Sequence, residues 1–288
     1  MFFNAVSKIK IFLYVFSVFL IGCGGKNTAT PDKPDPVFDT TIIDNDSIKV
    51  SKHFDTKSNT WYFLTRIRHK NKSGELIKLD LALTDQNKLM GETASEFAAR
   101  TGSALVFNAS MSTVVNTESG TDMRIPVGIQ IIDGTIVQER ESARYTLGIR
   151  EDNQLVVYPS GKTAQEILDD GTHTALTAFV PLIEQHKSVG DDVLDDVGNL
   201  SVKNPRQVIA QFDNMDILFL TCGGRGHGGE GMTAKEVIAV LTELDVRFAY
   251  NLDGGGSIST VVKGKFINWK IDANGTEERP RANFLFVE

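Results

Sequence analysis

Cysteine is scarce in this sequence, and long apolar runs are absent. The 288 residues include two cysteines, Cys23 and Cys222. Two cysteines exclude a disulfide framework and a zinc site built from a cysteine cluster. The apolar run Ile11–Ile21 has 11 residues, whereas a helix needs about 20 to span a bilayer. A membrane-spanning helix is therefore not expected.

Basic residues are also too few to define a nucleic-acid-binding surface. The chain has 30 Lys and Arg against 37 Asp and Glu, which gives a formal net charge of −7. Neutralisation of phosphates supplies most of the affinity for nucleic acid, so nucleic acid is not an expected partner. The chain is 41% hydrophobic and 23% charged, a balance typical of a globular protein with a sizeable core.

The N-terminal segment has the features of a bacterial lipoprotein signal. Two lysines precede the apolar run Ile11–Ile21, and Gly22 and Cys23 follow it. A positive region, a short apolar run and a small residue are typical of export signals. The end of the segment resembles the lipobox, whose cysteine receives the lipid. We expect residues 1–22 to be the signal and Cys23 to be lipidated; an ordinary signal peptide is the alternative.

The segment after Cys23 predicts a flexible tether. Residues 23–37 contain three prolines and few apolar side chains, a composition typical of linkers. A tether with a lipidated end would hold the folded part on a membrane. The expected location is the bacterial cell envelope, on the periplasmic face of the outer membrane or on the cell surface.

Short segments with alternating apolar and polar residues predict many strands in the rest of the chain. The segments 60–69 and 75–83 flank a turn and predict a hairpin. Two more hairpins are predicted around Asp133-Gly134 and Asp152-Asn153. The sheets are expected to be twisted and mixed or antiparallel.

Three Thr-x-x-Glu capping boxes predict helix starts. They begin at Thr93, Thr163 and Thr233. Few helices among many hairpins indicate an α+β fold. We expect an N-terminal β-rich subdomain at residues 38–92 and a single catalytic domain at residues 93–288.

A glycine-rich loop precedes the last predicted helix. Residues 224–229 match the G-x-G-x-x-G pattern of dinucleotide-binding proteins. The capping box starts the helix at Thr233, beyond the third glycine, which disfavours that function. We favour a loop that carries Arg225 and His227 over a substrate pocket. A surface loop without a function is the alternative.

The segment NLDGGGSIST (residues 251–260) places an aspartate and three glycines between two apolar segments. Asp253 ends the first segment, so its side chain is expected to project from a sheet into a cleft. Glycine allows a positive φ and the close approach of a ligand, and successive N–H groups can bind an anion. The alternative is that Asp253 only caps the turn. The candidate phosphate-binding residues are Gly254, Gly255, Gly256 and Ser257.

This motif and several other segments together resemble the phosphodiester glycosidases. The others are ALVFNAS with Asn108, NPRQVIA with Arg206, GKFINW, and ERPRANFLFV with Glu278 and Arg279. The resemblance covers roughly residues 93–288. It implies a hydrolase that removes a sugar, such as N-acetylglucosamine, from a sugar 1-phosphodiester.

The chemistry of this reaction gives each candidate residue a role. Asp253 is expected to stabilise or attack the oxocarbenium-like centre, with Glu278 as a second carboxylate. Arg206 and Arg279 are expected to hold the phosphate, because a guanidinium binds phosphate oxygens bidentately. Asn108 is expected to bind a sugar hydroxyl. The alternatives are surface ion pairs for the arginines, a solvated charge for Glu278 and a strand-ending turn for Asn108.

Two other functions stay open. Met111 and Gln207 differ from the usual residues of the family, which leaves room for a non-catalytic surface lipoprotein that binds glycan. A glycosidase acting on non-phosphorylated glycosides would need a general acid, for which Glu278 or His227 is the candidate. We expect no cofactor and no set of metal ligands, although a divalent cation shared by Asp253 and a bound anion is an alternative. The oligomeric state is not predicted.

Overall fold

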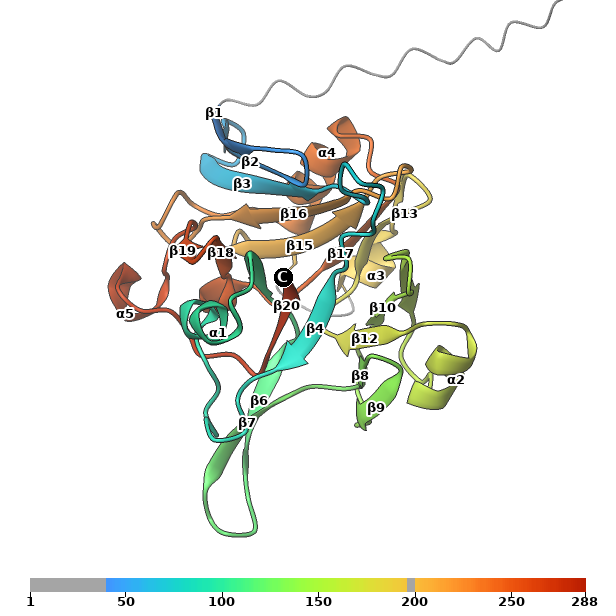
Figure 1. Ribbon diagram of the computed structural model, residues 1–288. Coiled ribbons are helices and arrows are strands. Elements are labelled where there is room, and N and C mark those ends of the chain that lie inside the picture. The colour runs from blue at the N-terminus through green and yellow to red at the C-terminus, as the bar shows by residue number, and fades with distance from the viewer. Residues whose placement is uncertain (1–39, 196–199) are drawn as a thin grey trace, which may run out of the picture. The chain divides into compact units, whose positions relative to one another are not determined.

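The computed structural model describes residues 40–195 and 200–288 (Figure 1). The predicted signal, the tether up to residue 37 and Cys23 lie outside the described residues. The chain from Val37 to Glu288 forms one compact unit. Within the described residues, no helix is both long and apolar enough to cross a membrane.

An eight-stranded antiparallel sheet forms the largest layer. Its strands, in spatial order, are β1 (Thr40–Asp44), β2 (Ile48–Asp55), β3 (Thr60–Ile67), β16 (Ile217–Cys222), β15 (Arg206–Gln211), β17 (Phe248–Asn251), β13 (Pro181–Glu184) and β14 (Lys187–Ser188). The central strands are apolar on both faces. In β16, Phe219 faces the inner core and Leu218 faces the outer one, because successive side chains of a strand point to opposite sides.

Two five-stranded sheets and one separate hairpin complete the β structure. One sheet has the order β11 (Leu155–Tyr158), β10 (Thr146–Ile149), β12 (Thr174–Thr177), β8 (Gln130–Ile132) and β9 (Thr135–Gln138). The other has the order β19 (Lys265–Phe266), β18 (Thr260–Val262), β5 (Leu105–Asn108), β20 (Asn283–Val287) and β4 (Asp80–Leu83). The hairpin of β6 (Ser112–Asn116) and β7 (Asp122–Pro126) projects away from the other elements in Figure 1.

The described helices are short, and three of the five begin at the predicted caps. They are α1 (Ala94–Thr101), α2 (Ala164–Asp169), α3 (Asp191–Asp195), α4 (Ala234–Glu243) and α5 (Asp272–Gly275), with a 3-10 turn η1 (Gly255–Ser257). Complete capping boxes form at Thr93, Thr163 and Thr233, as predicted. Helix α4 buries Val237 and Leu241 against the outer face of the large sheet. Full burial of such a side chain contributes about 1.5–3 kcal/mol.

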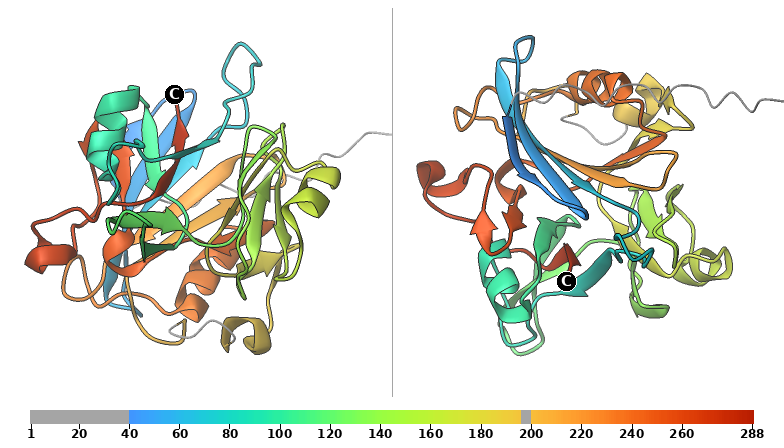
Figure 2. Two further views of the ribbon diagram at one scale, coloured as in Figure 1. Left: turned by 90° about the horizontal axis from the view of Figure 1, so that it is seen from below. Right: turned by 45° about the horizontal axis from the view of Figure 1, so that its top comes forward.

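The inner core lies between the large sheet and the two five-stranded sheets. Phe107 of β5 stacks on Phe219 of β16, with ring centroids 3.6 Å apart and an interplanar angle of 2°. Figure 2 shows α3 and α4 on the opposite side of the large sheet. These contacts hold the end of β5 beside the end of β17. The predicted α+β class is confirmed.

The predicted hairpins have different outcomes. Those around Asp133-Gly134 and Asp152-Asn153 form as β8–β9 and β10–β11. The predicted hairpin of residues 60–69 and 75–83 is wrong. Strand β3 pairs with β2 and β16, whereas β4 pairs with β20 in another sheet. A tight turn at residues 56–59 connects β2 to β3. Strand β3 therefore pairs with the strand that precedes it in the sequence, not with the segment 75–83 that follows it.

The predicted boundary between residues 92 and 93 does not separate two structural units. Strands β1–β3 belong to the same sheet as β16, and β4 belongs to the same sheet as β20. Within the described residues, 40–92 are therefore an integral part of the same sheets as the rest of the chain.

Candidate functional site

Asp253 lies directly beyond the central strand β17, where two sheets meet. Its backbone N–H donates to the carbonyl of Ala109, which follows β5, at 3.2 Å. The side-chain amide of Asn108 donates to the Asp253 carbonyl at 2.7 Å. These bonds fix the point at which the chain leaves the sheet. The predicted position of Asp253, at the end of a strand, agrees with this arrangement.

A buried arginine, Arg281, holds the Asp253 carboxylate. Its guanidinium donates to Asp253 Oδ2 and, at 3.2 Å, to the carbonyl of Ser110. The side chains of Arg281 and Asp253 are 3% and 13% exposed. Burial lowers the pKa of Arg281, and the charge of Asp253 opposes this shift. The carboxylate is thus oriented from the side of β20 and remains partly accessible.

Sequence reasoning missed Arg281, although a signal was present. Arg281 follows Arg279 by two residues and stands just before the apolar strand β20. A charged residue at the start of a buried strand needs a buried partner. This requirement favours Arg281, rather than Arg279, as the partner of a buried carboxylate.

A buried polar network supports the carbonyl to which Arg281 donates. The N–H of Ser110 donates to Asn283 Oδ1 at 3.0 Å, and the amide of Asn283 donates to Ser110 Oγ at 2.9 Å and to Gln130 Oε1 at 2.8 Å. Because each group has partners, the network fixes the backbone beside Asp253. The sequence did not reveal these residues as a group, since they come from β8, from β20 and from the segment after β5.

Two N–H groups of the predicted anion-binding nest are bonded within the protein. Gly255 donates its N–H to the carbonyl of Pro205 at 2.9 Å, and Ser257 donates to that of Gly254 at 3.1 Å. Among the three glycines only Gly255 has a positive φ, of 60°. These two donors are therefore already used inside the protein, and the cationic side chains around the turn are further candidates for binding phosphate.

Arg279 is one of these cationic side chains. It pairs bidentately with Asp272, at 2.6 Å and 2.7 Å, and its Nη1 lies 3.5 Å from Ser257 Oγ. The bonds to Asp272 raise the pKa of Arg279. A Cβ on Gly256 would lie 2.3 Å from Arg279 Nη2. Glycine at 256 thus allows the guanidinium to lie against the turn.

Arg225 and His227 lie in the glycine-rich loop, as predicted, and the loop is close to the turn. A Cβ on Gly255 would lie 3.0 Å from Arg225 Nη2. Arg225 is exposed and donates to Asn204 Oδ1 at 3.2 Å and 3.3 Å. The ring of His227 lies against Gly275. The loop therefore brings a second guanidinium to the turn, next to Gly255.

Arg206 is placed differently from the predicted phosphate clamp. Its side chain is 4% exposed, and its guanidinium donates to the carbonyls of Met232 at 2.9 Å and Val202 at 2.6 Å. Burial lowers its pKa. These contacts tie the segment before β15 to the start of α4, which is a structural role.

Asn108 and Glu278 also have contacts that differ from the predicted roles. Asn108 is fully buried, and its Oδ1 accepts from the N–H of Ser259 at 2.8 Å, so both ends of its amide serve the backbone around Asp253. Glu278 accepts from the N–H and hydroxyl of Ser95, at 3.1 Å and 2.6 Å. Asn108 therefore positions Asp253 rather than meeting a sugar, and Glu278 anchors the first turn of α1.

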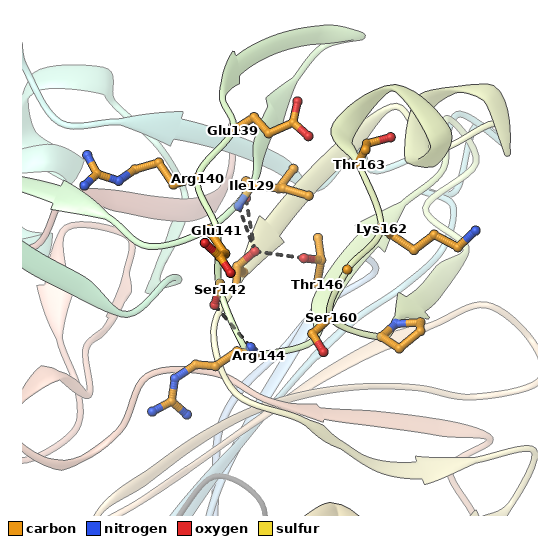
Figure 3. A pocket seen from close by; sticks show the side chains of 14 residues that line it. Ile129, Glu139, Arg140, Glu141, Ser142, Arg144, Thr146, Ser160, Lys162 and Thr163 are labelled. Atoms are coloured by element: carbon orange, nitrogen blue, oxygen red, sulfur yellow. Dashed lines mark hydrogen bonds between the residues drawn. The ribbon is translucent and has the colours of Figure 1, made fainter.

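A cavity of about 290 Å³ lies under the β10–β12 region (Figure 3). Its lining is polar, with several hydroxyl and charged side chains. The side chains that line it include Glu139, Arg144, Thr146, Ser160, Lys162 and Thr177. Thr146 and Thr177 share a hydrogen bond of 2.8 Å. In the part of the chain that the structure describes, no group of three or more His, Cys, Asp or Glu is arranged to hold a metal ion.

Comparison with protein-family models assigns the chain to a family. Residues 101–288 match the model of the phosphodiester glycosidases. The chain belongs to this family. Asp253, the glycine turn, Arg279 and Arg281 all lie within the matched residues.

Solved structures share the fold at low sequence identity. The catalytic domain of zebrafish N-acetylglucosamine-1-phosphodiester α-N-acetylglucosaminidase, auto-inhibited by its pro-peptide, aligns with a TM-score of 0.63 and 17% identity, over 84% of this chain and 82% of that one. A putative exported protein of Burkholderia pseudomallei aligns with a TM-score of 0.54 and 17% identity, over 79% and 74% of the two chains.

A curated relative is the SPbeta prophage-derived uncharacterized protein YomE of Bacillus subtilis. It is 29% identical over 182 residues, which cover 62% of this chain and 27% of YomE. The chain thus spans little more than a quarter of that protein's length.

Proposed function

We propose that this protein is a hydrolase that removes a sugar from a sugar 1-phosphodiester. The observation that carries the proposal is the position of Asp253. Its carboxylate is held by Arg281 at a strand end, and the next residues along the chain form a turn flanked by Arg225 and Arg279. A carboxylate next to two guanidinium groups suits a bond between an anomeric carbon and a phosphate oxygen.

Asp253 is the carboxylate that acts on the sugar. In an ion pair with Arg281 it is a hydrogen-bond acceptor only. It therefore serves as nucleophile or as stabiliser of the oxocarbenium-like centre, and it does not donate a proton. The bond from Arg281 orients the carboxylate, and the bond from Asn108 fixes the backbone carbonyl of Asp253. Together they lower the entropy cost of reaching the reactive geometry.

Arg225 and Arg279 hold the phosphate and take up the charge that grows on it as the bond breaks. Arg225 is exposed at Gly255, and Arg279 lies at Gly256 and Ser257. In this account they take the place of Arg206 as the phosphate-binding side chains.

A general acid is not required for this leaving group. The released phosphomonoester has a second pKa of about 6, so it departs near neutral pH without protonation. This agrees with the contacts of Glu278, which go to Ser95 and Lys270. A glycosidase acting on ordinary alcohol leaving groups would need a proton donor beside Asp253.

We further propose that the protein acts at the bacterial cell envelope, attached by a lipid on Cys23. The proposal rests on the lipobox-like segment that ends at this residue. Labelling growing cells with a fatty-acid analogue tests it. Label on the full chain and none on Cys23→Ser is the expected result, and equal labelling of both chains would contradict the anchor.

Turnover of defined substrates tests the enzymatic proposal. Methyl diesters of α-GlcNAc 1-phosphate and α-glucose 1-phosphate are assayed beside methyl α-GlcNAc, which lacks the phosphate. Asp253→Asn is compared with Asp169→Asn, a matched change at an exposed helix end. We expect turnover of the diesters only, loss by at least about a hundredfold in Asp253→Asn, and no change in Asp169→Asn. Binding of the diesters without turnover would indicate the non-catalytic glycan-binding alternative.

A further inference from the structure

Arg144 is a partly buried cation beside the site for which the described residues provide no counter-ion. It precedes β10, and its guanidinium carbon lies 4.5 Å from the centre of the Phe179 ring. Within residues 40–195 and 200–288 it makes no ion pair, and its Nη1 is buried without a hydrogen-bond acceptor. Leaving a buried donor of a charged group unsatisfied is unfavourable. A group that is not part of the protein would relieve this cost.

The nearby carboxylates do not neutralise Arg144. Burial lowers its pKa, and the charge of Asp253 opposes this shift. Asp253 already pairs with Arg281. Glu139 lines the same cavity, but it accepts from the N–H of Ala164 at 3.1 Å. Figure 3 shows the Arg144 guanidinium pointing away from Glu139.

Arg144 and the glycine turn lie on opposite sides of β17. In the large sheet β17 lies between β15 and β13. On the β15 side, Gly255 bonds to Pro205, just before that strand. On the β13 side, the N–H of Tyr145 donates to the carbonyl of Phe179, just before β13, at 3.1 Å. Asp253 follows β17 and therefore has a guanidinium on each side.

We infer that Arg144 binds an oxyanion carried by the sugar itself, so that the substrate is a 1-phosphodiester of an acidic sugar. This inference rests on the proposed function, which places the scissile phosphate at Arg225 and Arg279. With the anomeric carbon at Asp253, the rest of the sugar extends toward Arg144. A guanidinium binds a carboxylate or a phosphate in the same bidentate way, so a uronic acid and a sugar phosphate both fit.

Two matched substrate pairs test the inference. The methyl diester of α-glucuronic acid 1-phosphate is compared with that of α-glucose 1-phosphate, and the diester of 6-phospho-GlcNAc 1-phosphate with that of GlcNAc 1-phosphate. The variants are Arg144→Met, which keeps an apolar stem over Phe179, and Arg150→Met as a control. Arg150 follows the other end of β10 and bonds to Asp170.

We expect the wild-type protein to prefer the charged member of at least one pair by about tenfold or more, through KM. Arg144→Met should lose this preference, and Arg150→Met should keep it. A preference within the glucuronic acid and glucose pair would indicate a carboxylate, and a preference within the 6-phospho-GlcNAc and GlcNAc pair would indicate a phosphate. No preference in either pair, or an equal loss on all substrates in Arg144→Met, would overturn the inference while leaving the proposed function intact.

If the wild-type protein hydrolyses none of the diesters, the proposed function fails, and calorimetric binding then tests Arg144 alone. Glucuronic acid 1-phosphate and glucose 1-phosphate are titrated into the protein in separate experiments, and their affinities are compared. Tighter binding of the acidic sugar that disappears in Arg144→Met would support the oxyanion site. Equal binding of the two sugars would overturn it.

Discussion

The guanidinium of Arg281 joins two parts of the site, because it donates both to the carboxylate of Asp253 and to the carbonyl of Ser110. Asp253 follows the large sheet, whereas Ser110 follows a strand of a five-stranded sheet. Arg281 thus couples the orientation of the proposed catalytic carboxylate to the packing of two sheets. Any change that loosens the sheets is expected to disturb the site.

Removal of Arg281 should impair both stability and activity. Truncating one partner of a buried ion pair leaves the other charge buried and costs about 3–5 kcal/mol. Arg281→Met should therefore lower the free energy of unfolding in urea by this amount and abolish turnover. Arg281→Lys keeps the charge, but its shorter side chain does not bring the ammonium to the position of Nη2, from which both bonds are made. It should therefore recover part of the stability and little of the activity. Full activity in Arg281→Met would contradict the role of the pair.

Gly256 should not tolerate a side chain. A Cβ there would lie 2.3 Å from both Arg279 Nη2 and Asp272 Oδ1, so Gly256→Ala must separate the guanidinium from the turn. We expect kcat/KM for sugar phosphodiesters to fall by about a hundredfold or more, with a smaller loss of stability. Gly74→Ala is the control, since its surroundings are open and only its φ of 83° is strained. The control should cost about 1–2 kcal/mol in stability and leave kcat/KM unchanged.

Arg206 and Arg279 should respond differently to the same change. Arg206 binds backbone carbonyls in the interior, so Arg206→Met should lower the thermal midpoint strongly. Arg279 lies at the turn, so Arg279→Met should raise KM for the phosphodiester with a smaller effect on stability. Steady-state kinetics and calorimetry of both variants check this contrast. A selective rise in KM for Arg206→Met, without a lower thermal midpoint, would restore Arg206 as the phosphate ligand.

Glu92 should make stability depend on acid pH. Burial alone would raise its pKa, but the bonds from Arg100 and from the backbone of Asp85 outweigh burial, and the net shift is downward from 4.5. A lowered pKa means that the contribution of Glu92 is fully present above about 4.5 and is lost as the pH falls through the lower folded-state value. Glu92→Gln should therefore be less stable than the wild type at pH 7, with a difference that shrinks below pH 4. Urea unfolding across this range checks the prediction, and a difference that grows on acidification would contradict it.

The local signals in the sequence predicted much of the fold. The capping boxes at Thr93, Thr163 and Thr233 form because they depend on residues three apart. The hairpins at Asp133 and Asp152 also form, because each joins two strands that are neighbours in the sequence. The hairpin predicted after Thr60 is wrong, because the pairing of β3 is decided by β2 and β16, and β16 lies far away in the sequence.

The candidate site was predicted less completely. Asp253 lies at the end of a strand as expected, and the glycine-rich loop brings Arg225 to the turn. The placements of Arg206, Asn108 and Glu278 depend on which carbonyls and N–H groups surround them after folding, and no local pattern encodes this. Arg144 and Arg281 were missed because their relation to Asp253 exists only once β10, β17 and β20 are assembled.

The position of bond cleavage tests the central claim most directly. Hydrolysis of the methyl diester of α-GlcNAc 1-phosphate is run in water labelled with oxygen-18, and both products are examined by mass spectrometry. If Asp253 acts on the anomeric carbon, the label enters the released sugar and methyl phosphate stays unlabelled. Label in the phosphate product, with none in the sugar, would show attack at phosphorus and would contradict the account.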